Sequence, residues 1–405
     1  MPFQKKNRLQ NGMNFSLNCP IIIYVLLGVA FVLTLIIALC KWCKARRLSR
    51  FVVNEDEREY LADEQLPRAS VVVYAHNDAE WLENFLPALL QQDYPDYEVI
   101  VVDDASTDIS RNLISDMLTQ YPNLHLTLTP DRTRGLSRKK LSLMLGIKAA
   151  QGDVIVATNA NCCVTSDQWL RLMLRNFVPG TDVVIGYSHY RYKSDRRAGH
   201  CYRVFDTVTV GEQYLTSAIA GKPYRGVSDN LAYRRDAFFR NNGFSKNLDL
   251  RWGDDDVFLC EIAGSDNTRV ELAPESQVVA CYEDVSHAHT ALKMRRDFTS
   301  RKLPRRWPFI AQGLLSTLNY ARLGCLAAAV ALDWNNIFTL SVVAVLLILS
   351  WVLAILPVRK SCRVLQAPML STGVPLYNIC RPLVNLCYRL RGRKLSQSNL
   401  TSIFD

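Results

Sequence analysis

The chain has 405 residues, of which 49% are hydrophobic and 21% charged, and its formal net charge is +10. This length and composition allow a sizeable core and exclude a disordered chain. The positive charge does not indicate a nucleic-acid partner, because many basic residues flank apolar segments, where anionic lipid head groups are the simpler partner. The composition therefore predicts a globular domain held at a membrane.

The first apolar segment covers residues 21–40 and follows an N-terminal segment at 1–20. It contains no charged residue and is long enough to cross the hydrocarbon core of a bilayer. Residues 41–66 begin with a basic cluster, which by the positive-inside rule places the following chain in the cytoplasm. We expect a transmembrane helix at 21–40 and a basic juxtamembrane linker at 41–66.

Residues 67–305 have the pattern of an α/β domain, in which short β-branched runs alternate with segments of helical spacing. The predicted elements are, in chain order, a strand at 69–75, a helix at 81–90, a strand at 98–102, a helix at 137–150 and a strand at 154–157.

Two further apolar segments follow, at 309–332 and 336–358. The second has the composition of a transmembrane helix. The first contains Asn319 and Arg322, which must face another helix or reach the interface, so it is either a span or an interfacial helix. With both as spans, the N-terminus lies outside, and residues 359–405 form a basic cytoplasmic tail that lies along the membrane.

Polar residues follow three of the predicted strands, and ligands of open α/β sheets bind at such strand ends. A carboxylate there can accept hydrogen bonds from a nucleobase or from ribose hydroxyls. The alternative is that Asp104 caps the next helix. The residues at these ends are Tyr74 and His76, Asp103 and Asp104, and Asn159 and Asn161.

Three blocks of the sequence resemble family 2 glycosyltransferases and occur in that family's order. They are VVVYAHNDAEWLENFLPALLQQDYPDYEVIVVDDASTD, GLSRKKLSLMLGIKAAQGDVIVATNANC and GVSDNLAYRRDAFFRNNGFSKNLDLRWGDDDVFL. The resemblance implies a GT-A-like fold, which is a doubly wound, mostly parallel sheet, here with flanking transmembrane helices. These helices are similar to those of the membrane-bound, cellulose-synthase-like branch, particularly its bacterial members.

The resemblance also assigns roles on the donor side. Asp104, with Asp103, would hold the nucleoside of a nucleotide sugar, and Tyr74 with His76 would line that pocket. Lys139 or Lys140 would approach the diphosphate, where a flexible ammonium suits a phosphate charge. Without the family context, these lysines more often belong to a solvated helix face.

On the acceptor side, the acidic run Asp254, Asp255 and Asp256 matches the position of the family's general base, and we favour Asp255. A carboxylate there would take the proton from the acceptor hydroxyl. The alternative is an acidic cap for a helix that begins at Val257. The same resemblance gives an acceptor and diphosphate clamp made of Asn230, Arg306 and Trp307.

The sequence departs from the family where Asp-x-Asp normally stands, because it has Asn159, Ala160 and Asn161. The family's carboxylates hold Mg²⁺ or Mn²⁺ against the diphosphate, and asparagine is a much poorer ligand for such cations. Three outcomes follow: Lys or Arg stabilises the leaving group, Asp103 or Asp104 holds a metal, or the protein is a catalytically degenerate donor-binding pseudoenzyme.

The resemblance implies transfer of a sugar from a nucleoside diphosphate donor, by inversion, to a membrane-associated glycan or lipid-linked acceptor. The setting would be polysaccharide biosynthesis at the inner membrane of a bacterium, with a multi-pass chain and a cytoplasmic catalytic domain. A membrane-tethered signalling domain of receiver type is the alternative from another class, since it also has paired aspartates at a strand end and a later lysine.

Overall fold

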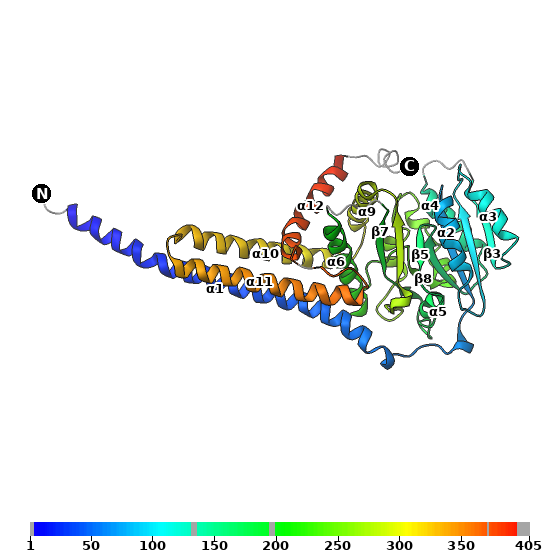
Figure 1. The fold of residues 1–405 in the computed structure, drawn as a ribbon, viewed down its shortest axis with the longest axis horizontal. Helices are drawn as coiled ribbons and strands as arrows, with labels where there is room; N and C mark the ends of the chain where they lie inside the picture. The colour runs from blue at the N-terminus through cyan, green and yellow to red at the C-terminus, as the bar shows by residue number, and fades with distance from the viewer. Residues whose placement is uncertain (1–3, 131–135, 194–198, 371, 395–405) are drawn as a thin grey trace.

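The computed structural model describes residues 4–130, 136–193, 199–370 and 372–394. Residues 1–3 of the predicted N-terminal segment, and residues 371 and 395–405 of the predicted tail, lie outside this range. The described chain forms an α/β domain and a long helical bundle that projects from one side of it (Figure 1).

The α/β domain is built on a mixed sheet of seven strands in the order β3-β2-β1-β4-β8-β6-β9. The first four strands run parallel, whereas β8 is antiparallel to both β4 and β6. The strands of this sheet are β1 (Ala69–Ala75), β2 (Tyr97–Asp103), β3 (Leu124–Leu128), β4 (Val154–Asn159), β6 (Val183–Ile185), β8 (Leu231–Arg234) and β9 (Thr268–Val270).

A second, three-stranded sheet lies beside the first and has the order β5-β10-β7. In it β10 pairs antiparallel with β5 and parallel with β7. Its strands are β5 (Cys162–Val164), β7 (Ser188–Tyr192) and β10 (Val278–Tyr282).

Both faces of the main sheet are buried, because successive residues of its strands enter two different cores. Val71 and Val73 pack into one core with Leu82 and Leu86 of the helix after β1. Val72 packs into the other. Alternation of this kind, with helices on both faces, is the doubly wound arrangement that the sequence predicts. The helices of the domain are α2 (Ala79–Leu90), α3 (Ser110–Leu118), α4 (Arg138–Ala149), α5 (Trp169–Leu174), α6 (His200–Ile219), α7 (Arg235–Arg240), α8 (Asp256–Ile262) and α9 (Val285–Ser300).

A close backbone approach fixes the start of β4. A Cβ atom on Gly152 would lie 2.6 Å from the backbone of Ala69 and Ser70 at the start of β1. Only glycine fits there, so the chain enters β4 directly beside β1. The expected strand at 69–75 matches the bounds of β1, and the ends of the other predicted elements of the domain lie within two residues of those in the structure.

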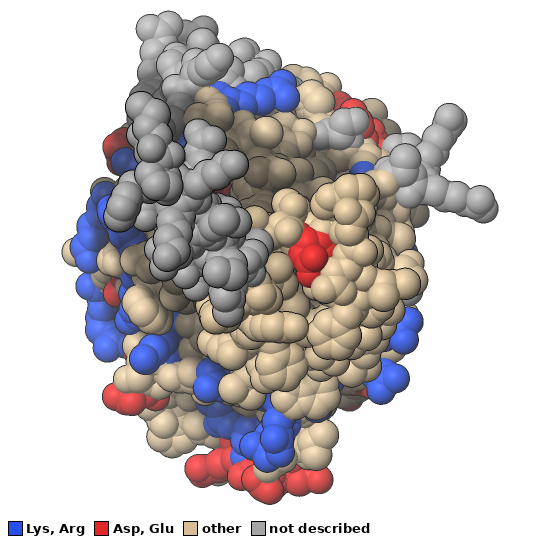
Figure 2. All heavy atoms as spheres, turned by 90° about the vertical axis from the view of Figure 1, so that its left-hand side faces the viewer, with Lys and Arg blue, Asp and Glu red and all other residues tan. Residues whose placement is uncertain are grey.

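The bundle consists of α1 (Gln4–Val53), α10 (Trp307–Leu332) and α11 (Ile337–Val364), all long and apolar enough to cross a membrane. Their inner faces share a small apolar core that includes Ala30 and Ala329. Large apolar side chains such as Ile21 and Ile348 are more than half exposed on the outside. Figure 2 looks along the bundle toward the domain; the near surface that is not grey is uncharged apart from one acidic patch, and charged residues of both signs lie around the rim.

Two boundaries differ from the prediction. The segment at 41–66 is not a linker from its start, because α1 continues as one helix to Val53. The tail after residue 359 is helical as well: α11 ends at Val364, and α12 (Val374–Lys394) packs against α9, α6 and the bundle. The loop between α10 and α11 lies at the far end of the bundle from the domain (Figure 1).

Candidate functional site

Asp104 follows β2 and has partners from two other elements. Tyr74, near the end of β1, donates its hydroxyl to Asp104 Oδ2 at 2.8 Å. Arg138, at the start of α4, donates to Asp104 Oδ1 at 2.9 Å. Burial and then the adjacent Asp104 charge raise the pKa of Tyr74, so its hydroxyl remains a donor. The strand end therefore carries a carboxylate held by a phenol and a guanidinium.

The loops after β1 and β2 are fastened to each other. Asn77 and Ala105 adopt positive φ values of 54° and 52°, a region that costs free energy for residues other than glycine. The Asn77 side chain accepts from the backbone of Thr107 at 2.8 Å, and His76 Nδ1 lies 2.7 Å from the Asp104 carbonyl oxygen. These contacts keep His76 beside Asp104.

The two predicted donor residues Asp103 and Lys140 have enclosed side chains. Asp103 is 2% exposed and accepts from the backbone of Ser106, so it supports the loop. Lys140 is fully buried, and its ammonium donates to both the carbonyl and the side chain of Asn247 at 2.6 Å. Both side chains are therefore occupied by hydrogen bonds within the protein, to Ser106 and to Asn247.

Lys139 occupies a different position from Lys140. Its ammonium lies 3.1 Å from Asp254 Oδ2 and 3.3 Å from Ser228 Oγ. It also lies 5.4 Å from the centre of the Tyr74 ring. Lys139 therefore connects the strand end that carries Asp104 to the acidic run.

The acidic run lies directly before and at the start of α8. Asp255 caps this helix, because its Oδ1 accepts from the backbone of Asp256 at 2.7 Å. Its other oxygen accepts from Arg295 of α9 at 2.6 Å. Arg295 also donates to Asp254 at 3.1 Å. Asp255 therefore caps α8, as the alternative interpretation of the acidic run expected, and it also belongs to a cluster of charged side chains.

The pKa values of Asp254 and Asp256 are shifted in opposite directions. For Asp254, burial acts to raise the pKa, but Arg295 and Lys139 together hold it well below its ordinary value. For Asp256, burial and the neighbouring Asp255 raise the pKa to about 7. The Asp256 carboxylate accepts from Thr299 at 2.6 Å, while its other oxygen has no partner among the described residues.

Asn159 is hydrogen-bonded to an aspartate that the sequence analysis missed. The antiparallel register pairs Ala157 of β4 with Leu231 of β8, so two residues farther along Asn159 lies near Asp229. Asn159 Nδ2 donates to Asp229 Oδ1 at 2.7 Å, and Ser188 donates to Oδ2 at 3.0 Å. The available signal was an acidic residue placed directly before Asn230, which the sequence assigns to the acceptor clamp.

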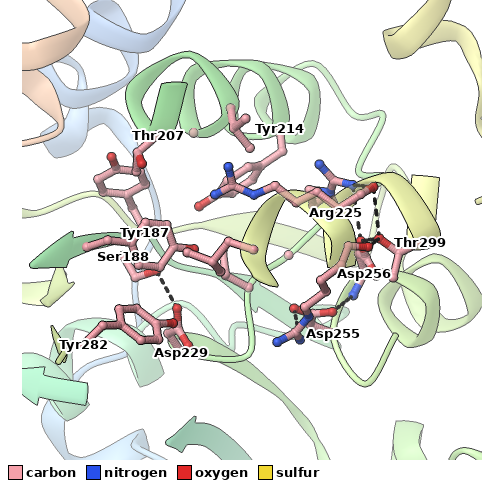
Figure 3. A pocket seen from close by; sticks show the side chains of 18 residues that line it. Tyr187, Ser188, Thr207, Tyr214, Arg225, Asp229, Asp255, Asp256, Tyr282 and Thr299 are labelled. Atoms are coloured by element: carbon pink, nitrogen blue, oxygen red, sulfur yellow. Dashed lines mark hydrogen bonds and ion pairs between the residues drawn. The ribbon is translucent and has the colours of Figure 1, made fainter. Parts of the chain in front are cut away.

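A cavity of about 550 Å³, partly open to solvent, lies between β7, α6, α9 and the acidic run (Figure 3). Asp229, Asp255 and Asp256 all line it, and Figure 3 shows Asp229 next to Tyr282, away from Asp255 and Asp256. Asp104 and Lys139 are outside its lining, and the Lys139–Asp254 ion pair connects the two regions. The cavity thus lies beside the predicted base.

The residues proposed for the acceptor clamp are not brought to this cavity. Asn230 is fully buried, and its amide is bonded to Trp169, to the Tyr187 carbonyl and to the Ser276 carbonyl. It is a core residue that fixes the turn. Trp307 is 70% exposed at the first turn of α10, and Arg306 directly before it is also exposed. The cations at the cavity are instead Arg225, Arg295 and Arg296.

The side chains at the Asp-x-Asp position do not fit a divalent metal. Asn159 and Asn161 are neutral, and their amide groups donate to Asp229 and to the Cys281 carbonyl. Asp104 is paired with Arg138. Within the described ranges, no three His, Cys, Asp or Glu side chains are placed to hold a metal ion. Hard cations prefer several carboxylate oxygens. The Mg²⁺ or Mn²⁺ that Asp-x-Asp holds in family 2 glycosyltransferases would therefore lack its usual ligands here.

Comparisons with known proteins identify a family for this sequence. The sequence model described as "Glycosyl transferase family 2" matches residues 70–240. Glycosyltransferase AglE of Haloferax volcanii is 27% identical over 194 residues, which are 46% of this chain and 60% of that protein. Glycosyltransferase GlyG of Streptococcus pneumoniae is 31% identical over 133 residues, 33% of this chain and 42% of that protein. The chain spans about half the length of the curated relatives it matches.

Among solved structures, a mannosyltransferase from Pyrobaculum calidifontis, in complex with GDP-Man and Mn²⁺, has a similar fold. The TM-score is 0.56 at 21% identity, over 89% of this chain and 99% of that one. The similar fold supports the GT-A-like architecture, and the sequence matches cover the segments that carry Asp104, Lys139 and Asn159. Residues 70–240 therefore belong to glycosyl transferase family 2.

Proposed function

We propose that this chain transfers a sugar from a nucleoside diphosphate sugar to a membrane-associated glycan or lipid acceptor, with inversion at the anomeric carbon. One observation carries the proposal: Asp104 and Asp255 are linked through Tyr74, Lys139, Asp254 and Arg295 in a continuous series of contacts. A donor bound at Asp104 would then extend its diphosphate and sugar toward Asp255.

The proposed step needs a base and a stabilised leaving group. Asp255 takes the proton from the acceptor hydroxyl, whose oxygen forms a bond to the anomeric carbon. The bond from that carbon to the diphosphate oxygen breaks, and its electron pair leaves with the nucleoside diphosphate. Lys139 lies between the two ends and can stabilise the developing negative charge.

Asp255 is a better candidate for the base than its neighbour. It lines the cavity, and its carboxylate is paired with Arg295 at 2.6 Å. Asp256, whose pKa is raised to about 7, is partly protonated at neutral pH and is enclosed by Thr299 and Arg225. A base must be ionised before it can accept a proton.

The poor fit to a metal favours the first of the three outcomes for the missing Asp-x-Asp, in which Lys or Arg stabilises the leaving group. Arg138, Lys139 and Arg295 lie along the series of contacts from Asp104 to Asp255. The degenerate pseudoenzyme is the competing proposal, and it is supported by the loss of both carboxylates at Asn159 and Asn161. The match to the family over residues 70–240 leaves no support for a receiver-type signalling domain.

A membrane-associated acceptor is supported by the three apolar helices that join the domain. We propose that all three cross the inner membrane of a bacterium, with the domain on the cytoplasmic side, because basic residues lie at the end of α1 nearest the domain. An active domain clamped to the bilayer suits lipid-linked or growing polysaccharide acceptors, as in the cellulose-synthase-like branch.

The test uses the full chain in detergent, screened against UDP- and GDP-sugars for binding, transfer and donor hydrolysis. We expect Asp104→Ala to lose donor affinity, and Asp255→Asn to keep affinity but lose transfer. Asp116→Asn, an exposed aspartate on α3, is the control and should match the parent. Donor binding by the parent without transfer or hydrolysis would favour the pseudoenzyme. If the Asp104 and Asp255 variants both behave like the parent, the proposed site is wrong.

A further inference from the structure

A second cavity lies where the helical bundle meets the α/β domain. It is lined by side chains from α1, α6, α10, α11 and α12, and the space between them is about 800 Å³, including its open mouth. Helix α6 separates it from the cavity at Asp255. Val210 and Tyr214 of α6 line the first cavity, whereas Thr209 and Gln213 line the second. The second cavity is therefore not part of the proposed transfer site.

A smaller cavity continues from the second one into the bundle. The two share Ile37, Lys41, Asn319 and Asn378 in their linings. The smaller one adds Arg322, together with apolar side chains from α11. The combined space thus reaches from the edge of the domain to the interior of the three candidate membrane helices.

The lining of this space is strongly cationic. Lys41, Lys44, Arg322 and Arg381 contribute four positive charges, and Glu212 is the one carboxylate in the two linings. The nearby Asp206 does not neutralise this positive charge. It accepts from Arg381 at 2.8 Å, but it also accepts from two other cations, Lys293 and Arg296.

Arg322 is the most unusual of these cations. It lies within α10, and its side chain is 7% exposed. One guanidinium nitrogen donates to Asn319 at 3.1 Å, while Nη1 has no partner among the described residues. A charge held within membrane helices is costly unless a counter-ion or hydrogen-bonding group meets it. Arg322 lines the smaller cavity, so an anion bound there can supply the missing partner.

We propose that this cavity binds the phosphate group of an anionic membrane lipid, with its head group among Lys41, Arg322 and Arg381. Guanidinium and ammonium groups together suit phosphate, which accepts several charge-assisted hydrogen bonds. A lipid fits better than a free phosphate ion because the cavity adjoins the candidate membrane spans. Apolar side chains in its lining, including Ile37 and Leu315, can contact an acyl chain.

The experiment measures binding alone, so its result does not depend on whether the chain transfers a sugar. Full-length protein in a non-ionic detergent is titrated with dihexanoyl phosphatidic acid, with dihexanoyl phosphatidylcholine and with inorganic phosphate, using calorimetry. We expect phosphatidic acid to bind at least about tenfold more tightly than either of the others. Equal binding of phosphatidic acid and phosphatidylcholine would overturn the proposal. Inorganic phosphate that binds as tightly as phosphatidic acid would identify a site for the free ion instead.

Substitutions locate the site. Arg322→Gln and Lys41→Gln should each weaken the binding of phosphatidic acid about tenfold, the effect of losing one charged hydrogen bond. Arg47→Gln removes a charge from the same end of α1, but its exposed side chain is absent from both linings. It should stay within about twofold of the parent. An equal loss in all three variants would indicate general surface attraction and contradict the proposal. If Arg322→Gln does not fold, the comparison of phosphatidic acid binding between Lys41→Gln and Arg47→Gln still tests the proposal.

Discussion

The ammonium of Lys139 lies 3.1 Å from the carboxylate of Asp254, which joins the first turn of α4 to the acidic run before α8. The Asp254 side chain is 1% exposed and that of Lys139 is 20% exposed. The pair is therefore largely shielded from solvent but reachable from the donor side. Because Lys139 also faces the Tyr74 ring, a diphosphate that enters beside Asp104 would meet this ammonium.

Replacing Lys139 tests its role at the diphosphate. Lys139→Gln should weaken donor binding about tenfold or more, because it removes one charge-assisted hydrogen bond to phosphate. Calorimetric titration with the nucleotide sugar that binds the parent measures the change. Lys148→Gln, at an exposed position of the same helix, should bind like the parent. A Lys139→Gln variant with parental affinity would place the diphosphate elsewhere.

Lys140 should instead contribute to stability. Lys140→Met leaves the Asn247 carbonyl and side-chain oxygen without their buried donor, so we expect a loss of about 2–4 kcal/mol in the free energy of unfolding. The midpoint of thermal unfolding of the full chain in detergent should fall by several degrees. Donor affinity of the remaining folded protein should stay close to that of the parent. A stability equal to the parent's with a lost affinity would show that Lys140 acts at the donor.

The strands and helices around the donor side could be predicted because their signals are local. The run Ala69–Ala75 is mostly apolar and contains three consecutive β-branched valines, and the structure gives β1 those bounds. Asp104 was identifiable for the same reason, since a polar residue directly after a buried strand lies at the sheet edge. These patterns need no knowledge of which elements meet in space.

The remaining contacts depend on residues far apart in the chain. Asp229 meets Asn159 only because β8 runs antiparallel to β4, and no local pattern shows that pairing. Asn230 is predicted in the acceptor clamp, but its amide donates to the Tyr187 carbonyl and accepts from Trp169 of α5 in the core. The helix α1 extends beyond the predicted end at residue 40, because a basic cluster does not interrupt helical hydrogen bonding and the helix continues to Val53.

Removing divalent metals should leave donor binding largely intact. Asn159 donates its amide to Asp229, and Asp104 is paired with Arg138, so the described residues offer poor ligands for Mg²⁺ or Mn²⁺. We expect the dissociation constant of the donor measured in EDTA to lie within about threefold of that in Mn²⁺, a difference of less than 1 kcal/mol. A much larger gain in affinity with Mn²⁺ would show that the donor phosphates bring a metal to this site.

The acidic run should give the stability of the chain a pH dependence that depends on Asp256. Its pKa in the folded protein is about 7, above the ordinary value of 3.8. Between these values the folded state keeps a proton that the unfolded state has lost, so the free energy of unfolding falls as the pH rises from 5 to 8. The loss is on the order of 2 kcal/mol, and Asp256→Asn should remove most of it because asparagine does not titrate.

Asp254→Asn provides the matched comparison, because the pKa of Asp254 is shifted in the opposite direction. Burial alone would raise it, but Arg295 and Lys139 lower it below 3.8, so Asp254 is ionised in both states from pH 5 to 8. Its stabilising contribution is lost only as the pH falls below 3.8. Thermal unfolding is therefore measured at pH 5 and at pH 8. The Asp254→Asn variant should be less stable than the parent at both pH values, and the difference in stability should be similar. An Asp256→Asn variant that keeps the parent's pH dependence would show that another group carries it.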